Sequence, residues 1–97
     1  MRAAALRVEL HLPAVQSLKS KRGVLRPVVE GIKRLGSYSV AEVGHQDDWQ
    51  RASIGIAVVA RDGAGLEVQV SRLRRYLDSC LEIEVIEVLL VELEEPE

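Results

Sequence analysis

Segments with strand-like alternation of apolar and polar residues and segments with apolar residues at helical spacing follow one another along the 97 residues. The order of these segments constrains the fold of this chain more than any other feature. Residues 3–12 alternate apolar and polar side chains, which is typical of a strand with one buried face. Pro13 ends this strand, because proline has no N–H group to donate to a sheet. The same reasoning predicts three further strands, at residues 38–45, 51–61 and 82–93.

Two segments between these strands carry apolar residues at helical spacing. The first begins after Ser17, a favourable N-cap residue, and ends at Gly36, directly after its last apolar position. Pro27 lies inside this segment, so we expect either a kink or a helix that starts afresh at Pro27. The second helix follows Asp62, which can cap it, and continues to Cys80.

This β-α-β-β-α-β order predicts an α+β protein of the ferredoxin-like class. Right-handed crossovers place both helices on one face of a four-stranded antiparallel sheet with the strand order 4-1-3-2. The even-numbered residues of the first and third strands would then face the helices. We expect one domain, residues 1–97, with an acidic C-terminal tail from about residue 94.

Composition excludes several functional classes. No segment approaches the roughly 18 consecutive apolar residues of a membrane span, and no signal peptide is recognisable, so we expect a cytoplasmic protein without membrane contact. Cys80 is the only cysteine, which excludes an internal disulfide and a cysteine-based metal site. The net charge of −2 gives no overall basic field that would attract nucleic acid.

The charges are nevertheless distributed unevenly along the chain. The first predicted helix holds six cations against one acid, Glu30, whereas the C-terminal segment is acidic. Free N–H groups at the start of a helix also favour anions. Our candidates for binding RNA or another anion are therefore the cations in its first turns, Lys19, Lys21, Arg22 and Arg26. The alternative interpretation is a solvated helix face.

The connection between the second and third predicted strands carries more polar chemistry than a turn requires. Residues 42–52 contain the only tryptophan, one of the two histidines and several acids and amides. In the predicted topology this hairpin lies beside the end of the first strand and the start of the first helix. We therefore predict a recognition site at this rim of the sheet, formed by His11, Ser17, His45, Gln46, Asp47, Trp49 and Arg51.

Three motifs in these regions resemble the YlxP-like family of small bacterial proteins. They are LHLP at residues 10–13, SLKSKR at residues 17–22 and VAEVGHQDDWQRA at residues 40–52. The resemblance extends over nearly the whole chain and implies a ferredoxin-like fold. Genes of this family often lie beside genes for transcription elongation, translation initiation and ribosome maturation. The resemblance thus implies an association with RNA or the ribosome, and it implies no catalytic residues.

Other classes of site have less support in the sequence. The exposed faces of the two central strands lack aromatic residues, so we do not expect RNA bases to stack on the sheet. Neither a metal nor another cofactor is expected, because the two histidines and two acids of the rim lack a fixed ligand spacing. An enzyme is not expected either, since no nucleophile has a recognisable base and no phosphate-binding loop is present.

The open face of the predicted sheet suggests a partner surface. It would expose Ala5, Gly55, Ala57 and Val59 together with one face of the last strand, whose residues 88–91 are apolar on both faces. We therefore predict a homodimer, formed through this face or by edge pairing. Our functional hypothesis is a non-enzymatic domain that contacts RNA or a ribosomal subunit. The alternative is a homodimeric module that binds a small molecule or anion at the same rim.

Overall fold

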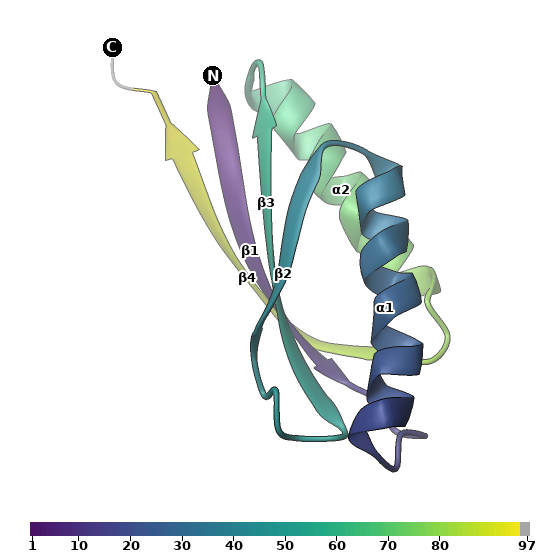
Figure 1. Ribbon diagram of the computed structural model, residues 1–97. Coiled ribbons are helices and arrows are strands. Elements are labelled where there is room, and N and C mark those ends of the chain that lie inside the picture. The colour runs from purple at the N-terminus through teal and green to yellow at the C-terminus, as the bar shows by residue number, and fades with distance from the viewer. Residues whose placement is uncertain (96–97) are drawn as a thin grey trace.

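The computed structural model of the protein describes residues 1–95 and contains one four-stranded sheet and two helices. The elements are β1 (Arg2–His11), α1 (Leu18–Leu35), β2 (Tyr38–Gly44), β3 (Arg51–Ala60), α2 (Gly63–Ser79) and β4 (Glu84–Glu94). All strand pairs are antiparallel and the strand order is β2-β3-β1-β4, with both helices on one face (Figure 1). The predicted ferredoxin-like fold, its strand order and its element order are confirmed.

The observed strand boundaries lie within about two residues of the predicted ones. One alternative for α1 is wrong: the helix is continuous through Pro27 and does not start afresh there. Pro27 and Gly23 are both exposed, so water can bond the Gly23 carbonyl that loses its intrahelical partner. The predicted acidic tail overlaps the end of β4, and residues 96–97 lie outside the described residues.

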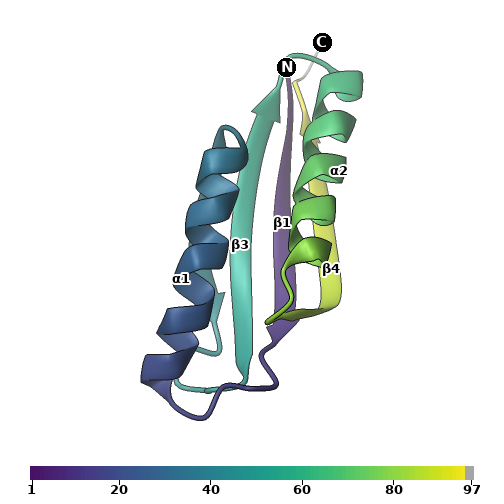
Figure 2. The ribbon, with the colours of Figure 1, turned by 90° about the vertical axis from the view of Figure 1, so that its right-hand side faces the viewer.

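The core lies between the sheet and the helices and is almost entirely aliphatic. As predicted, the even-numbered residues of the two central strands are buried: Ala4, Leu6, Val8, Leu10, Ala52, Ile54, Ile56 and Val58. The helices contribute Leu25, Val28, Ile32, Leu66, Leu73 and Leu77. Each of the larger aliphatic side chains contributes about 1.5–3 kcal/mol when it is fully buried. Figure 2 shows both helices in front of the sheet, with α1 toward β2 and α2 nearer β4.

The two helices approach closely at one glycine. A Cβ atom at Gly31 would lie 1.8 Å from the Tyr76 hydroxyl oxygen, so only glycine leaves room for this ring. The Tyr76 hydroxyl group donates a hydrogen bond to the Val28 carbonyl at 3.2 Å. Burial raises the pKa of Tyr76 above its usual value. Tyr76 therefore joins α2 to α1 by both packing and a hydrogen bond.

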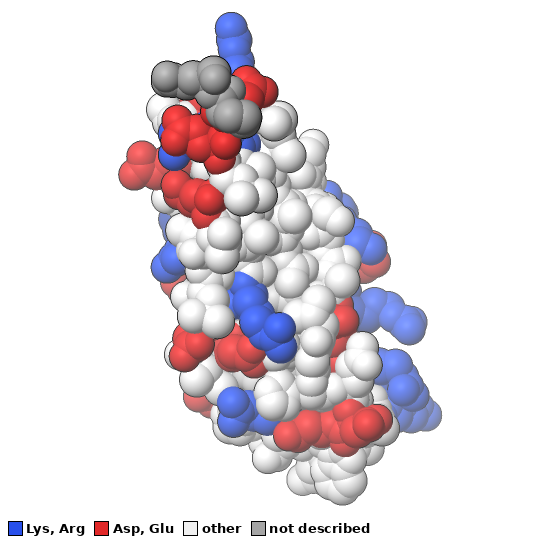
Figure 3. Space-filling model, turned by 90° about the vertical axis from the view of Figure 1, so that its left-hand side faces the viewer, with Lys and Arg blue, Asp and Glu red and all other residues white. Residues whose placement is uncertain are grey.

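The other face of the sheet is left open. Figure 3 views the molecule from this side and shows a broad uncharged area in its middle, with charges mainly toward the two ends. The described chain ends, at the start of β1 and the end of β4, lie at one end of the sheet (Figure 1). No helix in residues 1–95 combines the length and the hydropathy needed to cross a membrane.

Candidate functional site

The β1–α1 loop and the β2–β3 hairpin meet at the end of the sheet opposite these chain ends (Figure 1). Leu12 N donates to the Gln50 carbonyl at 2.9 Å, which joins the two loops through their backbones. The Gln50 side-chain amide donates to the carbonyls of Pro13 and Val15, at 3.3 and 3.1 Å. The sequence did not predict this role of Gln50, because no sequence pattern distinguishes a glutamine that joins two loops from one whose side chain is surrounded by water.

The hairpin itself has a defined conformation. His45 adopts a left-handed backbone conformation, with φ of 57°, which is uncommon for residues other than glycine. Asp48 N donates to the His45 carbonyl at 3.1 Å, and the Asp48 carboxylate accepts from Gln50 N at 3.0 Å. Asp48 therefore stabilises the turn. Asp47 and Trp49 point outward, and Trp49 is 51% exposed.

Lys21 holds this hairpin against α1. Its ammonium group donates to the carbonyls of His45 and Asp48, at 2.6 and 2.8 Å, and lies 3.2 Å from a Glu42 carboxylate oxygen. Only 3% of Lys21 is exposed. Its place among the predicted surface cations is therefore corrected: Lys21 binds the protein's own loop and cannot reach an external phosphate.

The position of Lys21 in the sequence distinguishes it from the exposed cations of α1. The buried residues of α1 are Lys21, Leu25, Val28 and Ile32, which follow the spacing i, i+4, i+7 and i+11. Lys21 thus occupies one position of the buried stripe, where a long side chain can extend along the helix to a polar end.

Ser17 begins α1 as predicted. Its hydroxyl group accepts from Ser20 N at 3.0 Å, and the Ser20 hydroxyl group accepts from Ser17 N at 3.1 Å. This reciprocal capping satisfies two backbone donors at the start of the helix. The Ser17 side chain therefore positions the first turn of α1.

Three of the predicted cations do form an exposed stripe. Lys19, Arg22 and Arg26 follow the spacing i, i+3 and i+7 and therefore share one face of α1. The first turn of α1 contains no acid. Among residues 1–95, none of these three cations has a carboxylate oxygen within 4.0 Å. The stripe presents uncompensated positive charge beside the hairpin.

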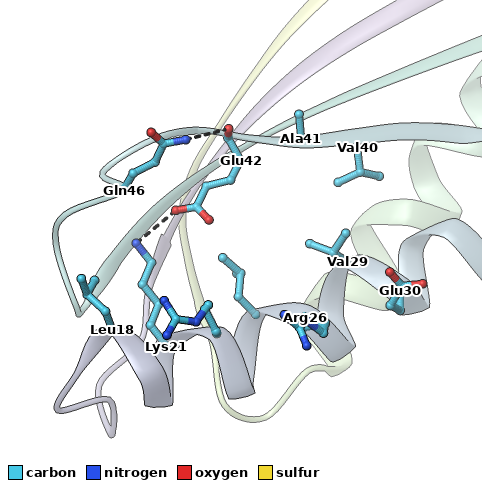
Figure 4. A pocket seen from close by; sticks show the side chains of 11 residues that line it. Leu18, Lys21, Arg26, Val29, Glu30, Val40, Ala41, Glu42 and Gln46 are labelled. Atoms are coloured by element: carbon cyan, nitrogen blue, oxygen red, sulfur yellow. Dashed lines mark hydrogen bonds and ion pairs between the residues drawn. The ribbon is translucent and has the colours of Figure 1, made fainter.

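A groove runs between α1 and β2, which is an edge strand (Figure 4). Its volume is about 420 Å³, and its lining residues are Leu18, Lys21, Arg22, Leu25, Arg26, Val29, Glu30, Val40, Ala41, Glu42 and Gln46. The two acids that line the groove each have a lysine partner: Glu42 contacts Lys21, and Glu30 contacts Lys33 at 3.8 Å. These contacts compensate the two negative charges. Arg22 and Arg26 therefore leave the groove positively charged above an apolar floor.

The open-face side of the rim holds a second polar cluster, centred on Glu9. Ser53 donates a hydrogen bond to one Glu9 carboxylate oxygen, and Arg7 Nε donates to the other at 3.0 Å. These two hydrogen bonds lower the pKa of Glu9 below its usual value. His45 Nε2 lies 3.6 Å from Glu9 Oε2. Sequence reasoning missed Glu9 and Ser53, because their pairing depends on the register of β1 and β3.

The remaining rim residues do not form one cluster. His11 Nδ1 lies 3.5 Å from a Glu84 carboxylate oxygen, so the two histidines contact different glutamates. Arg51 stands opposite His11 in the β1–β3 ladder and is half-buried. Gln46 lines both the α1–β2 groove and a shallow hollow formed by residues 45–50. No group of three or more His, Cys, Asp or Glu residues within residues 1–95 is arranged to hold a metal ion.

Comparison with other proteins gives a family and a fold. The family described as "Protein of unknown function (DUF503)" matches residues 3–89. An "Uncharacterized protein YlxP" of Bacillus subtilis (strain 168) is 40% identical over 68 residues, which cover 70% of this chain and 74% of that protein. A solved structure, "De novo designed protein Foldit4", has a TM-score of 0.53 at 15% identity and covers 97% of this chain. Since its identity is so low, that structure supports the fold alone.

Proposed function

This chain belongs to the DUF503 family of proteins of unknown function, and from that premise we propose that it is a non-enzymatic RNA-contacting domain. Its ligand is single-stranded RNA, for example an exposed strand of a ribosomal subunit, and it acts in the cytoplasm. Lys19, Arg22 and Arg26 bind the phosphates, and Trp49 stacks on a base. The protein thereby binds and stabilises an RNA segment and performs no reaction on it.

The observation that supports this proposal is the uncompensated stripe on α1. Lys19 and Arg22 are separated by about 4.5 Å along the helix axis, and Arg22 and Arg26 by about 6 Å. Such a line of cations suits successive phosphates of one extended strand. Contacts to phosphates carry no sequence information, so we expect binding that is sensitive to salt and tolerant of sequence.

Trp49 adds a feature that a basic helix alone lacks. It belongs to the hairpin that Lys21 holds against α1, and half of its surface is exposed. Stacking of a base on an aromatic ring contributes about 1–3 kcal/mol. Trp49 would therefore favour a single strand, whose bases are accessible, over a duplex or a polyanion without bases.

The experiment measures binding of a short labelled single-stranded RNA over a range of salt concentrations. Exchanging Arg22→Glu together with Arg26→Glu should weaken binding about tenfold or more, since both phosphate contacts are lost. The slope of log affinity against log salt should become shallower by about 1.4, which is roughly 0.7 for each of two contacts. Binding to ribosomal subunits, measured by co-sedimentation, should fall in parallel.

The matched control exchanges two exposed arginines away from the stripe, Arg61→Glu together with Arg75→Glu. Both double variants change the net charge from −2 to −6, because each substitution adds −2. The control should retain nearly wild-type affinity. Equal losses in the two variants, or no binding by the wild type at low salt, would contradict the proposal.

Trp49→Ala separates stacking from charge. It should weaken RNA binding about fivefold or more and leave binding of inorganic polyphosphate unchanged, because polyphosphate has no bases. An unchanged affinity for RNA would remove Trp49 from the site and leave only the cationic stripe.

The groove supports a second candidate function, the binding of a small amphiphilic anion. Its volume falls within the range of small-molecule sites, and its floor is apolar where Leu25, Val29 and Val40 line it. Octanoate is a suitable probe, since its chain matches that floor and its carboxylate matches Arg22 and Arg26. A saturable rise in melting temperature with octanoate, in a protein that binds no RNA, would favour this function over the first.

A further inference from the structure

The open face of the sheet carries large side chains along one strand and small side chains along its neighbours, and the pairing register of the strands determines this arrangement. Along β4, large aliphatic side chains form what we call the ridge: Leu89, Val91 and Leu93. Beside it on β1 and β3 lie small residues that we call the trough: Ala3, Ala5, Gly55 and Ala57. Ala5 stands opposite Ala57 on one side and opposite Val91 on the other. The ridge therefore runs beside the alanines of the trough on one surface, and Arg7 stands between Gly55 and Leu89.

The trough is bounded at both ends. Val59 stands opposite Ala3 in the ladder and is 62% exposed. A Cβ atom at Gly55 would lie 3.0 Å from Val43 Cγ1, so Val43 leans over the other end. The small residues thus form a limited depression that side chains of ordinary size can fill.

Charge does not oppose close approach of a partner to this face. Arg7 is the cation nearest its middle, and it contacts Glu9 at 3.0 Å. Figure 3 shows a broad uncharged area on this face, with acidic residues beside the central cation and toward the two ends. A partner would therefore cover paired charges and apolar carbon.

The sequence of β4 conflicts with its position in the isolated chain. Residues 88–91 are consecutive apolar residues, which is typical of a strand covered on both faces. Yet β4 is an edge strand, and Leu89, Val91 and Leu93 are 51%, 59% and 62% exposed. The conflict disappears if another molecule covers this strand.

We propose that the open face binds a second copy of this chain, face to face, with the ridge of each copy seated in the trough of the other. A two-fold interface requires a surface that is complementary to itself, and a face that carries both ridge and trough meets this requirement. Two sheets packed in this way lie about 10 Å apart. The ridge side chains fill the space that the alanines of the trough leave open.

The size of the face agrees with a stable dimer. Ten-residue strands are about 33 Å long and four strands span about 19 Å, so the flat projection of the face is on the order of 600 Å². The accessible surface of projecting side chains exceeds this projection and approaches the roughly 800 Å² per partner of a standard interface. In such a dimer the helices face outward on both sides, so both copies of the α1 stripe stay accessible.

The experiment measures molar mass by light scattering and by sedimentation equilibrium at protein concentrations from about 1 to 100 μM, a range in which specific dimers form. The wild type should show twice the chain mass of 10.7 kDa. Val91→Lys in the ridge should give a monomer with unchanged circular dichroism. The matched control is Val68→Lys, since Val68 is 54% exposed on α2 and lies outside the proposed interface. This control should remain dimeric.

Ala57→Lys distinguishes the face from the edge. Ala57 lies in the trough on β3, away from the free edge of β4, so this variant should also be monomeric. A wild type that stays monomeric throughout the concentration range would overturn the proposal. A dimeric Ala57→Lys beside a monomeric Val91→Lys would overturn it as well, because the copies would then pair through the β4 edge.

Discussion

The two faces of the sheet differ in what completes them. On the helix side, β1 and β3 bury aliphatic residues under α1 and α2, and single contacts such as Gly31–Tyr76 fix the distance between the two helices. On the open side, the neighbouring residues of the same strands meet no covering element in residues 1–95. Because successive side chains alternate across a strand, the same strands form one face that is covered by internal contacts and one face that can contact other molecules. Substitutions on the first should change folding stability, and those on the second should change association.

The largest effect is expected where the helices touch. Gly31→Ala places a methyl group on the Tyr76 hydroxyl oxygen and should destabilise the protein by about 3 kcal/mol, because the two helices must separate to accommodate it. Gly23→Ala is the control in the same helix. Nothing lies within 4 Å of a Cβ atom there, so this change should stabilise the protein by about 0.5–1 kcal/mol. Urea unfolding measures both, and equal effects would contradict the close contact.

The next effect concerns the lysine that joins the hairpin to α1. Lys21→Met should lower the free energy of unfolding by about 2 kcal/mol, because two loop carbonyls and Glu42 lose a buried charged partner. Lys19→Met, two residues away on the exposed face, should change it by less than about 0.5 kcal/mol. Denaturant unfolding of the two variants provides the measurement. A mild Lys21→Met variant would mean that the hairpin is held mainly by Gln50.

A smaller change in stability is expected from substitutions at two adjacent residues of β1 that face opposite sides of the sheet. Ala4 is buried beneath the helices, so Ala4→Leu should cost about 1–3 kcal/mol by overpacking. Ala5 is exposed on the open face, so Ala5→Leu should change stability by less than about 0.5 kcal/mol in the monomer. Unfolding is best measured at low protein concentration, where association does not contribute. Similar costs for both would show that the open face is already packed within the monomer.

The smallest effect is the acid dependence that Glu9 contributes. Its pKa in the folded protein is lowered by the hydrogen bonds from Ser53 and Arg7, so its stabilisation is complete above the usual pKa of 4.5. That stabilisation is lost as the pH falls from about 4.5 through the lower pKa of the folded state. Glu9→Gln should flatten the stability curve in this range, whereas Glu82→Gln, an exposed control, should follow the wild type. Identical curves for the three proteins would exclude this contribution.

Candidate-site residues were predictable where local patterns were sufficient. Ser17 and Asp62 were identified as helix caps from their positions before helical patterns, and both form the expected backbone hydrogen bonds. Lys21 was misplaced because its charge outweighed its position on the buried stripe of α1. Glu9 and Gln50 were missed because Ser53 lies 44 residues from Glu9, and the carbonyls that accept from the Gln50 side chain lie at least 35 residues away. No local pattern encodes such contacts.

The sequence by itself determined the element order, and hence the ferredoxin-like topology, since hydrophobic period and chain handedness leave few alternatives. It also determined which residues of the central strands face the helices, because successive side chains alternate across a strand. Only the tertiary structure decided which groups Lys21 binds, because the His45 and Asp48 carbonyls lie 24 and 27 residues away in sequence. Likewise, only the strand register placed the ridge of β4 beside the trough of β1 and β3, since neighbours across a sheet are set by pairing over long sequence distances.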